Sequence, residues 1–68
     1  MNKYQIECKM LRRQTFPTLD AALLYTLNSI DDIHYHFITT TFYSDYCVEL
    51  MVASPTNKTE NIRIVKVA

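Results

Sequence analysis

Two histidines that are separated by one residue offer the most direct metal chemistry in this sequence. His34 and His36 would lie on one face of a strand, and Cys47 and Glu49 fall on the same predicted face. A zinc site needs three or four ligands that converge at about 2 Å from the ion. In the strand pairing predicted below, Cys47 lies opposite Phe42, several residues from either histidine. The spacing therefore favours two partly exposed strand histidines, and we expect no metal and no cofactor.

Nucleophilic and acid–base chemistry is equally weakly supported. Cys8 or Cys47 could pair with a histidine, but no catalytic signature flanks either cysteine, and Cys8 alternates with apolar neighbours as a small core residue would. Asp31 and Asp32 are adjacent, which is typical of a turn. The chain contains no glycine, which excludes glycine-cradled phosphate loops. We therefore predict that the protein is not an enzyme.

The basic residues are confined to the two ends of the chain. The first thirteen and last eleven positions hold all seven lysines and arginines and two acids, a net charge of +5, whereas residues 14–57 hold five acids and no lysine or arginine. Such asymmetry orients a protein toward its partners. Nucleic-acid binding is the alternative function, expected to be weak and salt-sensitive because the aromatic residues lie in the acidic middle. The basic surface would comprise Lys9, Arg12, Arg13, Arg63 and Lys66.

The length of 68 residues predicts a single domain, residues 1–68, with a marginal core. The first ten residues lack the apolar run of a signal peptide, so we expect a cytoplasmic protein with free thiols. No apolar run approaches the roughly 20 residues of a membrane span, and so short a chain leaves little room for a pocket. We expect no membrane association and no small-molecule substrate. The wealth of Asn, Thr, Tyr and Ile fits a phage or mobile-element product.

The first half of the chain predicts one strand and one helix. Residues 3–13 alternate between polar and apolar, which predicts a half-buried strand that ends or bulges near Leu11. Thr18 suits the N-cap of a helix, with Asp20 in its first turn. The helix is expected to end by Ser29 or Ile30, because the next two residues are acidic. Its apolar stripe is Leu19, Ala22, Leu23, Thr26, Leu27 and Ile30.

The second half predicts three strands. Residues 33–43 are rich in aromatic and β-branched side chains, and they are expected to form a hairpin with residues 46–54 about a turn at Ser44-Asp45. A loop at 55–59 and a strand at 60–67 follow. The predicted fold is α+β: a β-α-β-β-β domain whose four-stranded, mostly antiparallel sheet carries one helix on one face. The order of the strands is left open.

The predicted turn sets the two faces of the hairpin. It would pair Tyr43 with Tyr46 and Phe42 with Cys47. The face beneath the helix would then carry Ile33, Tyr35, Phe37, Thr39, Thr41, Val48, Leu50 and Val52. The outer face would carry His34, His36, Ile38, Thr40, Phe42, Cys47, Glu49, Met51 and Ala53. A register shifted by one residue would exchange these faces.

Apolar residues cluster on this outer face, and exposed apolar clusters mark interaction sites. We therefore predict a non-enzymatic protein–protein interaction module, a small modulator or inhibitor of another protein, which also forms a homodimer. Leu24 and Tyr25 lie off the main helix stripe, and would either cover the sheet edge or extend the binding surface. The predicted partner-binding residues are Ile38, Phe42, Met51, Glu49, Leu24 and Tyr25.

Overall fold

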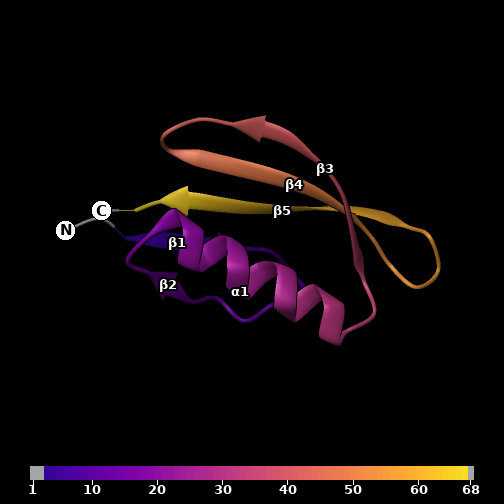
Figure 1. The fold of residues 1–68 in the computed structure, drawn as a ribbon. Coiled ribbons are helices and arrows are strands. Elements are labelled where there is room, and N and C mark those ends of the chain that lie inside the picture. The colour runs from indigo at the N-terminus through magenta and orange to yellow at the C-terminus, as the bar shows by residue number, and fades with distance from the viewer. Residues whose placement is uncertain (1–2, 68) are drawn as a thin grey trace.

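The chain forms five strands and one helix in the order β-β-α-β-β-β (Figure 1). The computed structural model describes residues 3–67. The predicted α+β class, with a single helix on an antiparallel sheet, is confirmed, and the sheet gains a short fifth strand. The elements are β1 (Tyr4–Glu7), β2 (Thr15–Phe16), α1 (Leu19–Asp32), β3 (His36–Tyr43), β4 (Cys47–Ala53) and β5 (Thr59–Lys66).

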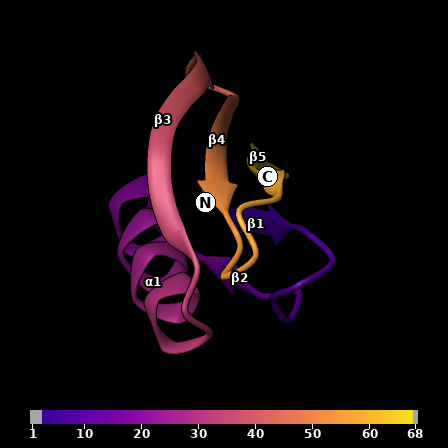
Figure 2. The ribbon, with the colours of Figure 1, turned by 90° about the vertical axis from the view of Figure 1, so that its right-hand side faces the viewer.

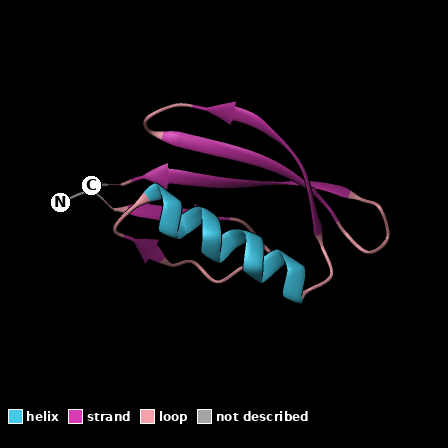
Figure 3. Cartoon of the chain, viewed as in Figure 1, coloured by secondary structure: helices cyan, strands magenta, loops and turns pink. Residues whose placement is uncertain are grey.

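The sheet is antiparallel throughout, with the strand order β2-β1-β5-β4-β3. The first and last long segments are therefore neighbours, and Val67 N–H donates to the Lys3 carbonyl at 2.8 Å. The helix α1 lies across one face of the sheet (Figure 3). Strand β3 forms one edge of the sheet, where it is curved and pairs with β4 along its length (Figure 2). The other edge is the two-residue strand β2.

The first predicted strand is too long. Strand β1 ends at Glu7, and the chain then loops back to form β2, in which Phe16 pairs with Tyr4. Cys8 and Met10 still pack against the core, although they lie outside any strand. The alternation of residues 3–13 therefore indicates which side chains pack against the core, but it does not predict how many of these residues form a strand.

The start of α1 is as predicted. The Ala21 N–H donates to Thr18 Oγ1 at 3.1 Å, and Asp20 lies in the first turn, where its charge meets the positive end of the helix dipole. Ala22, Thr26 and Ile30 are buried along the predicted stripe. The buried Thr26 hydroxyl donates a hydrogen bond to the Ala22 carbonyl at 2.8 Å, so this polar group has a partner inside the core.

The predicted end of α1 is wrong, because the helix continues through Asp31 and Asp32. A Schellman arrangement closes it: His34 N–H donates to the Asp31 carbonyl at 3.0 Å, and Tyr35 N–H donates to the Ile30 carbonyl at 2.8 Å. His34 has φ of 64°, the left-handed conformation that glycine usually supplies. Burial of Ile30 fixes this last turn and outweighs the two unfavourable acids.

The exit from α1 also shortens the next strand. Residues 33–35 form this exit, so β3 begins at His36 and not at Ile33. Ile33 is exposed, contrary to its predicted place in the core face, whereas Tyr35 is half-buried against the core. The core itself gathers residues from β1, α1, β4 and β5: Ile6, Ala22, Ile30, Val52, Ile62 and Ile64.

The predicted hairpin turn is displaced. Ser44 N–H donates to the Cys47 carbonyl at 2.8 Å, so the two loop residues are Asp45 and Tyr46. Phe42 consequently lies opposite Glu49, and not opposite Cys47 as predicted. Beside the turn, this displacement moves the partners of Phe42 and Tyr43 by two positions along β4. Because the faces of a strand alternate with period two, the side chains beside the turn keep their predicted faces.

Two β-bulges in β3 then change the faces further from the turn. The register shifts between Phe37 and Thr39 and again between Thr40 and Phe42. Thr39 lies opposite Met51 on the outer face, and Thr40 lies opposite the buried Leu50 on the helix side. The predicted faces of these two threonines are therefore exchanged, because each bulge inserts one unpaired residue into β3.

Candidate interaction surface

All eight residues of β3 are exposed, while the adjacent strand β4 buries most of its helix-facing side chains. Strand β3 pairs with a neighbour on one side only, and α1 contacts it mainly near its start. Phe42 retains 54% of its accessible surface, Tyr43 retains 68% and Ile38 retains 45%. An exposed strand this rich in aromatic and apolar side chains is a candidate binding surface.

Ile38, Phe42 and Met51 form what we call the outer patch. Phe42 lies opposite Glu49 and Thr39 lies opposite Met51, two positions further along β4. Ile38 has no partner of its own in β4, as expected of a bulged residue. Met51 is half-buried. Figure 2 shows α1 on one face of the sheet. The outer patch lies on the opposite face, where no helix of residues 3–67 covers it.

Glu49 supplies a polar group in the middle of the outer face. It forms an exposed ion pair with Arg63, with 3.4 Å between Oε2 and Nη2, and accepts a hydrogen bond from the Thr41 hydroxyl at 3.3 Å. An exposed pair of this kind contributes about 0–1 kcal/mol. The ion pair and the hydrogen bond hold the Glu49 carboxylate in one position beside Phe42.

The predicted basic surface is divided. Lys9, Arg12 and Arg13 are exposed between β1 and β2. Arg63 lies on the outer face, between Glu7 and Glu49 in the ladder. Lys66 is three residues further along β5, on the opposite face, where its ammonium lies 5.9 Å from the centre of the Tyr46 ring. The five predicted cations do not share one face.

The residues considered for metal or nucleophilic chemistry are also dispersed. His34 lies in the helix cap and His36 opens β3, next to Ala53 at the far end of β4 from Cys47. Within residues 3–67, no three His, Cys, Asp or Glu side chains are grouped to hold a metal ion. Cys8 and Cys47 are both free and half-buried.

Tyr25 and Leu24, the two predicted binding residues of the helix, have different surroundings. The Tyr25 ring lies 5.1 Å from the Phe16 ring at an interplanar angle of 40°, so Tyr25 covers the β2 edge. Leu24 is 63% exposed. Of the two alternatives left open by the sequence, the position of Tyr25 fits edge covering, and a role of Leu24 and Tyr25 in binding a partner stays a prediction.

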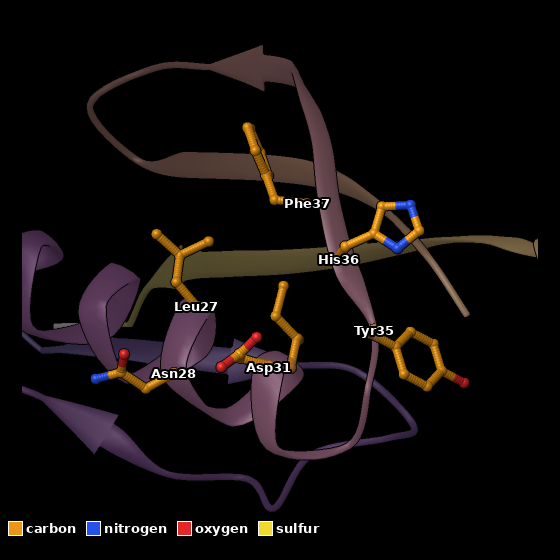
Figure 4. Close-up of a pocket in the computed structure, with 7 residues that line it drawn as sticks. Leu27, Asn28, Asp31, Tyr35, His36 and Phe37 are labelled. Carbon is orange, nitrogen blue, oxygen red and sulfur yellow. The ribbon is translucent and has the colours of Figure 1, made fainter. Parts of the chain in front are cut away.

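An open cavity of about 290 Å³ lies between the last turns of α1 and the start of β3. Leu27 and Phe37 lie on the side where the helix faces the strand, whereas the Tyr35 and His36 rings point the other way (Figure 4). The Tyr35 hydroxyl donates to Glu60 Oε2 at 3.0 Å. This hydrogen bond, assisted by desolvation, raises the pKa of Tyr35 above its ordinary value.

A second hollow borders the outer patch through Met51 and measures about 420 Å³. Ligand sites typically enclose about 300–1,000 Å³. This hollow is open to solvent, so the expectation of no small-molecule substrate stays a prediction. The hollow is lined by Cys8, Lys9, Met10, Met51, Thr59, Glu60 and Asn61.

No protein-family model matches this chain, and no curated protein or solved structure matches it either. Within residues 3–67, no helix has the length and apolar character needed to cross a membrane. The candidate surface is therefore assigned from its own geometry. Ile38, Phe42 and Met51 were predicted for this surface by type and alternation, and they stay predicted binding residues. The sequence gave no sign that Tyr43 and the whole of β3 would be exposed.

Proposed function

We propose that this chain is a non-enzymatic protein–protein interaction module, which binds another protein through the outer patch and acts as its modulator or inhibitor. The observation that carries the proposal is the exposure of Phe42 and Ile38 on a sheet face that no helix covers. Residues of this kind supply most of the binding energy when a partner removes them from water.

The polar residues around the outer patch suit a protein partner. Glu49 and Arg63 present both signs of charge beside Phe42, which resembles the polar rim around the apolar centre of a protein interface. A nucleic acid would favour a continuous basic surface, and here Arg63 is paired while Lys66 lies on the other face. Weak, salt-sensitive binding to nucleic acid through Lys9, Arg12 and Arg13 stays a prediction of the alternative function.

Phe42→Ser tests the proposal against a matched control. A partner captured from cells of the source organism is first purified, and its affinity is then measured by calorimetry. Phe42→Ser should weaken binding by about tenfold or more, since loss of a central aromatic costs at least about 1.4 kcal/mol. Tyr46→Ser removes a ring of similar exposure in the turn, and should bind as the wild type does. Equal losses in the two variants, or no loss in either, would contradict the outer patch as the site.

Kinetics separate the apolar patch from the charged ends. Met51→Ala should mainly speed dissociation, with little dependence on salt. Arg12→Glu combined with Arg13→Glu should slow association, and added salt should reduce this effect because it screens the charges. Circular dichroism must first show that each variant folds. A folded pair of variants that both bind like the wild type would move the site to the helix face around Leu24.

A further inference from the structure

The backbone of β3 presents three residues to the free edge of the sheet. In an antiparallel ladder, successive residues direct their N–H and C=O groups to alternate sides. Cys47 bonds toward β3 through Ser44 N–H, and Tyr46 bonds toward β5 through Lys66 N–H at 2.7 Å. By alternation, Glu49 and Met51 also face β3. Their partners Phe42 and Thr39 therefore bond toward β4. The N–H and C=O groups of Phe37, Thr40 and Tyr43 point instead to the free edge, and we call these three the outward residues.

The two bulges make this edge symmetric about Thr40. Thr41 precedes Phe42 in one bulge and donates to the carboxylate of Glu49, the partner of Phe42. Ile38 is the corresponding unpaired residue of the other bulge, before Thr39 and its partner Met51. The side chains of Phe37, Thr40 and Tyr43 consequently point to the helix face of the sheet. The two side chains between each of these, at 38–39 and at 41–42, point to the outer face. Reversing the direction of the strand leaves this pattern unchanged.

The residue types are nearly symmetric about the same point. An aromatic residue followed by an apolar one opens the segment, three threonines fill its centre, and an apolar aromatic followed by an aromatic closes it. The strand contains no proline and no Asp, Glu, Lys or Arg, the residues that usually protect a sheet edge against pairing. This edge is therefore complementary to a second copy of itself.

We propose that two copies of the chain pair through β3 in an antiparallel register centred on Thr40, which joins their sheets into one. This register alone lets all three outward residues of one copy meet outward residues of the other. Phe37 lies opposite Tyr43 of the second copy, Thr40 lies opposite its counterpart, and Tyr43 lies opposite Phe37. A shift to the next outward residue would leave only two such pairs.

Side chains in this register pair with others on the same face. On the helix face, Tyr43 of the second copy lies next to Phe37, beside the open cavity that Leu27 also lines. On the outer face, Ile38 lies opposite Phe42 of the second copy. Aromatic and apolar cross-strand pairs of this type stabilise a sheet. The two-fold axis closes the assembly at two copies, because each chain offers one long free edge.

The pairing deepens the proposed function, because it places two outer patches side by side on a continuous face. It does not depend on any other partner, so the two proposals can fail separately. Loss of self-pairing with retained binding to a partner would refute only the dimer. A dimer whose Phe42 has no role in partner binding would refute only the proposed function.

Thr40→Pro tests the edge directly. Proline removes an N–H that points away from β4, so the fold should tolerate it on an edge strand, while the centre of the dimer loses a hydrogen bond on each side. Light scattering of the wild type at micromolar concentration and above should give about 16 kDa, twice the 8.0 kDa of one chain. Thr40→Pro should give a folded monomer, and Thr40→Val, which keeps the N–H, should remain dimeric.

A charge exchange tests the register independently. Because Thr40 faces its own counterpart, Thr40→Lys and Thr40→Glu should each be monomeric alone, and an equimolar mixture should form a heterodimer. A wild type that stays monomeric up to millimolar concentration would overturn the proposal, as would a folded Thr40→Pro variant that stays dimeric. Folded Lys and Glu variants that fail to associate when mixed would overturn the register centred on Thr40.

Discussion

Strands β3 and β5 have the same length of eight residues, but they occupy opposite situations. Strand β3 is the more apolar and aromatic of the two, and all of it is exposed. Strand β5 contains Glu60, Arg63 and Lys66, yet its Ile62 and Ile64 are completely buried. It lies between β1 and β4 beneath α1, whereas β3 has one neighbour. Composition thus indicates which segments become strands, but the position in the sheet decides which strand carries the core.

A pair of isoleucine truncations gives the largest contrast between the two strands. Ile62→Ala should lower the free energy of unfolding by about 2–5 kcal/mol, enough to unfold much of so small a domain, because it leaves a cavity in the core. Ile38→Ala removes the same atoms from an exposed site and should cost less than about 1 kcal/mol. Urea denaturation at a concentration where the chain is monomeric measures both. Comparable losses would mean that β3 is buried in the free protein.

The N-cap of α1 tests how much the core depends on its cover. Thr18→Ala removes the acceptor of the Ala21 N–H and should cost about 1 kcal/mol. Thr18→Ser keeps a hydroxyl at the same position and should recover most of this loss. The helix contacts β1, β2 and β5, and it meets β3 only through its last turns, far from Thr18. Amides of β5 should therefore exchange faster in Thr18→Ala while those of β3 should change little. A larger change in β3 would contradict the separation of the two regions.

His34 lies at the junction between the covered region and β3. Replacing it with glycine should raise the free energy of unfolding by about 0.5–1 kcal/mol, because glycine adopts the left-handed conformation without steric cost. His34→Ala is the control, and it should not stabilise the fold, since alanine keeps the Cβ that causes the strain. Thermal unfolding of the two variants measures the difference. A glycine variant less stable than the alanine variant would show that the His34 side chain itself contributes.

The smallest effect concerns the bond that ties the start of β3 to β5. The Tyr35 hydroxyl donates to Glu60, and this raises the pKa of Tyr35 above 10.0, its ordinary value. The contribution of the bond is complete below that value and is lost as the pH rises through the pKa of the folded state. The wild type should therefore lose more stability than Tyr35→Phe as the pH is raised above 10.0. Parallel pH profiles would show that the bond does not contribute in solution.

Several local features followed from the sequence because neighbouring residues determine them. Thr18 caps α1 as predicted, since its hydroxyl needs only the backbone N–H three residues later. The alternation of β4 placed Val48, Leu50 and Val52 inward, and all three are buried. Phe42 also kept its predicted outer face, although the predicted pairing was displaced by two residues.

Other features were decided by tertiary structure. Nothing local in residues 33–43 distinguishes an edge strand from a central one, because the difference depends on whether another strand occupies each side. The bulges at Ile38 and Thr41 fit β3 to the twisted surface of β4 and have no sequence signature of their own. The sequence by itself determined the helix and the four longer strands, though not all of their ends, and the direction in which most of their side chains alternate. Only the packing of β5 between β1 and β4 decided that the aromatic strand β3 would lie at an edge and stay exposed, because a five-stranded sheet under one helix can bury its centre but not its edge.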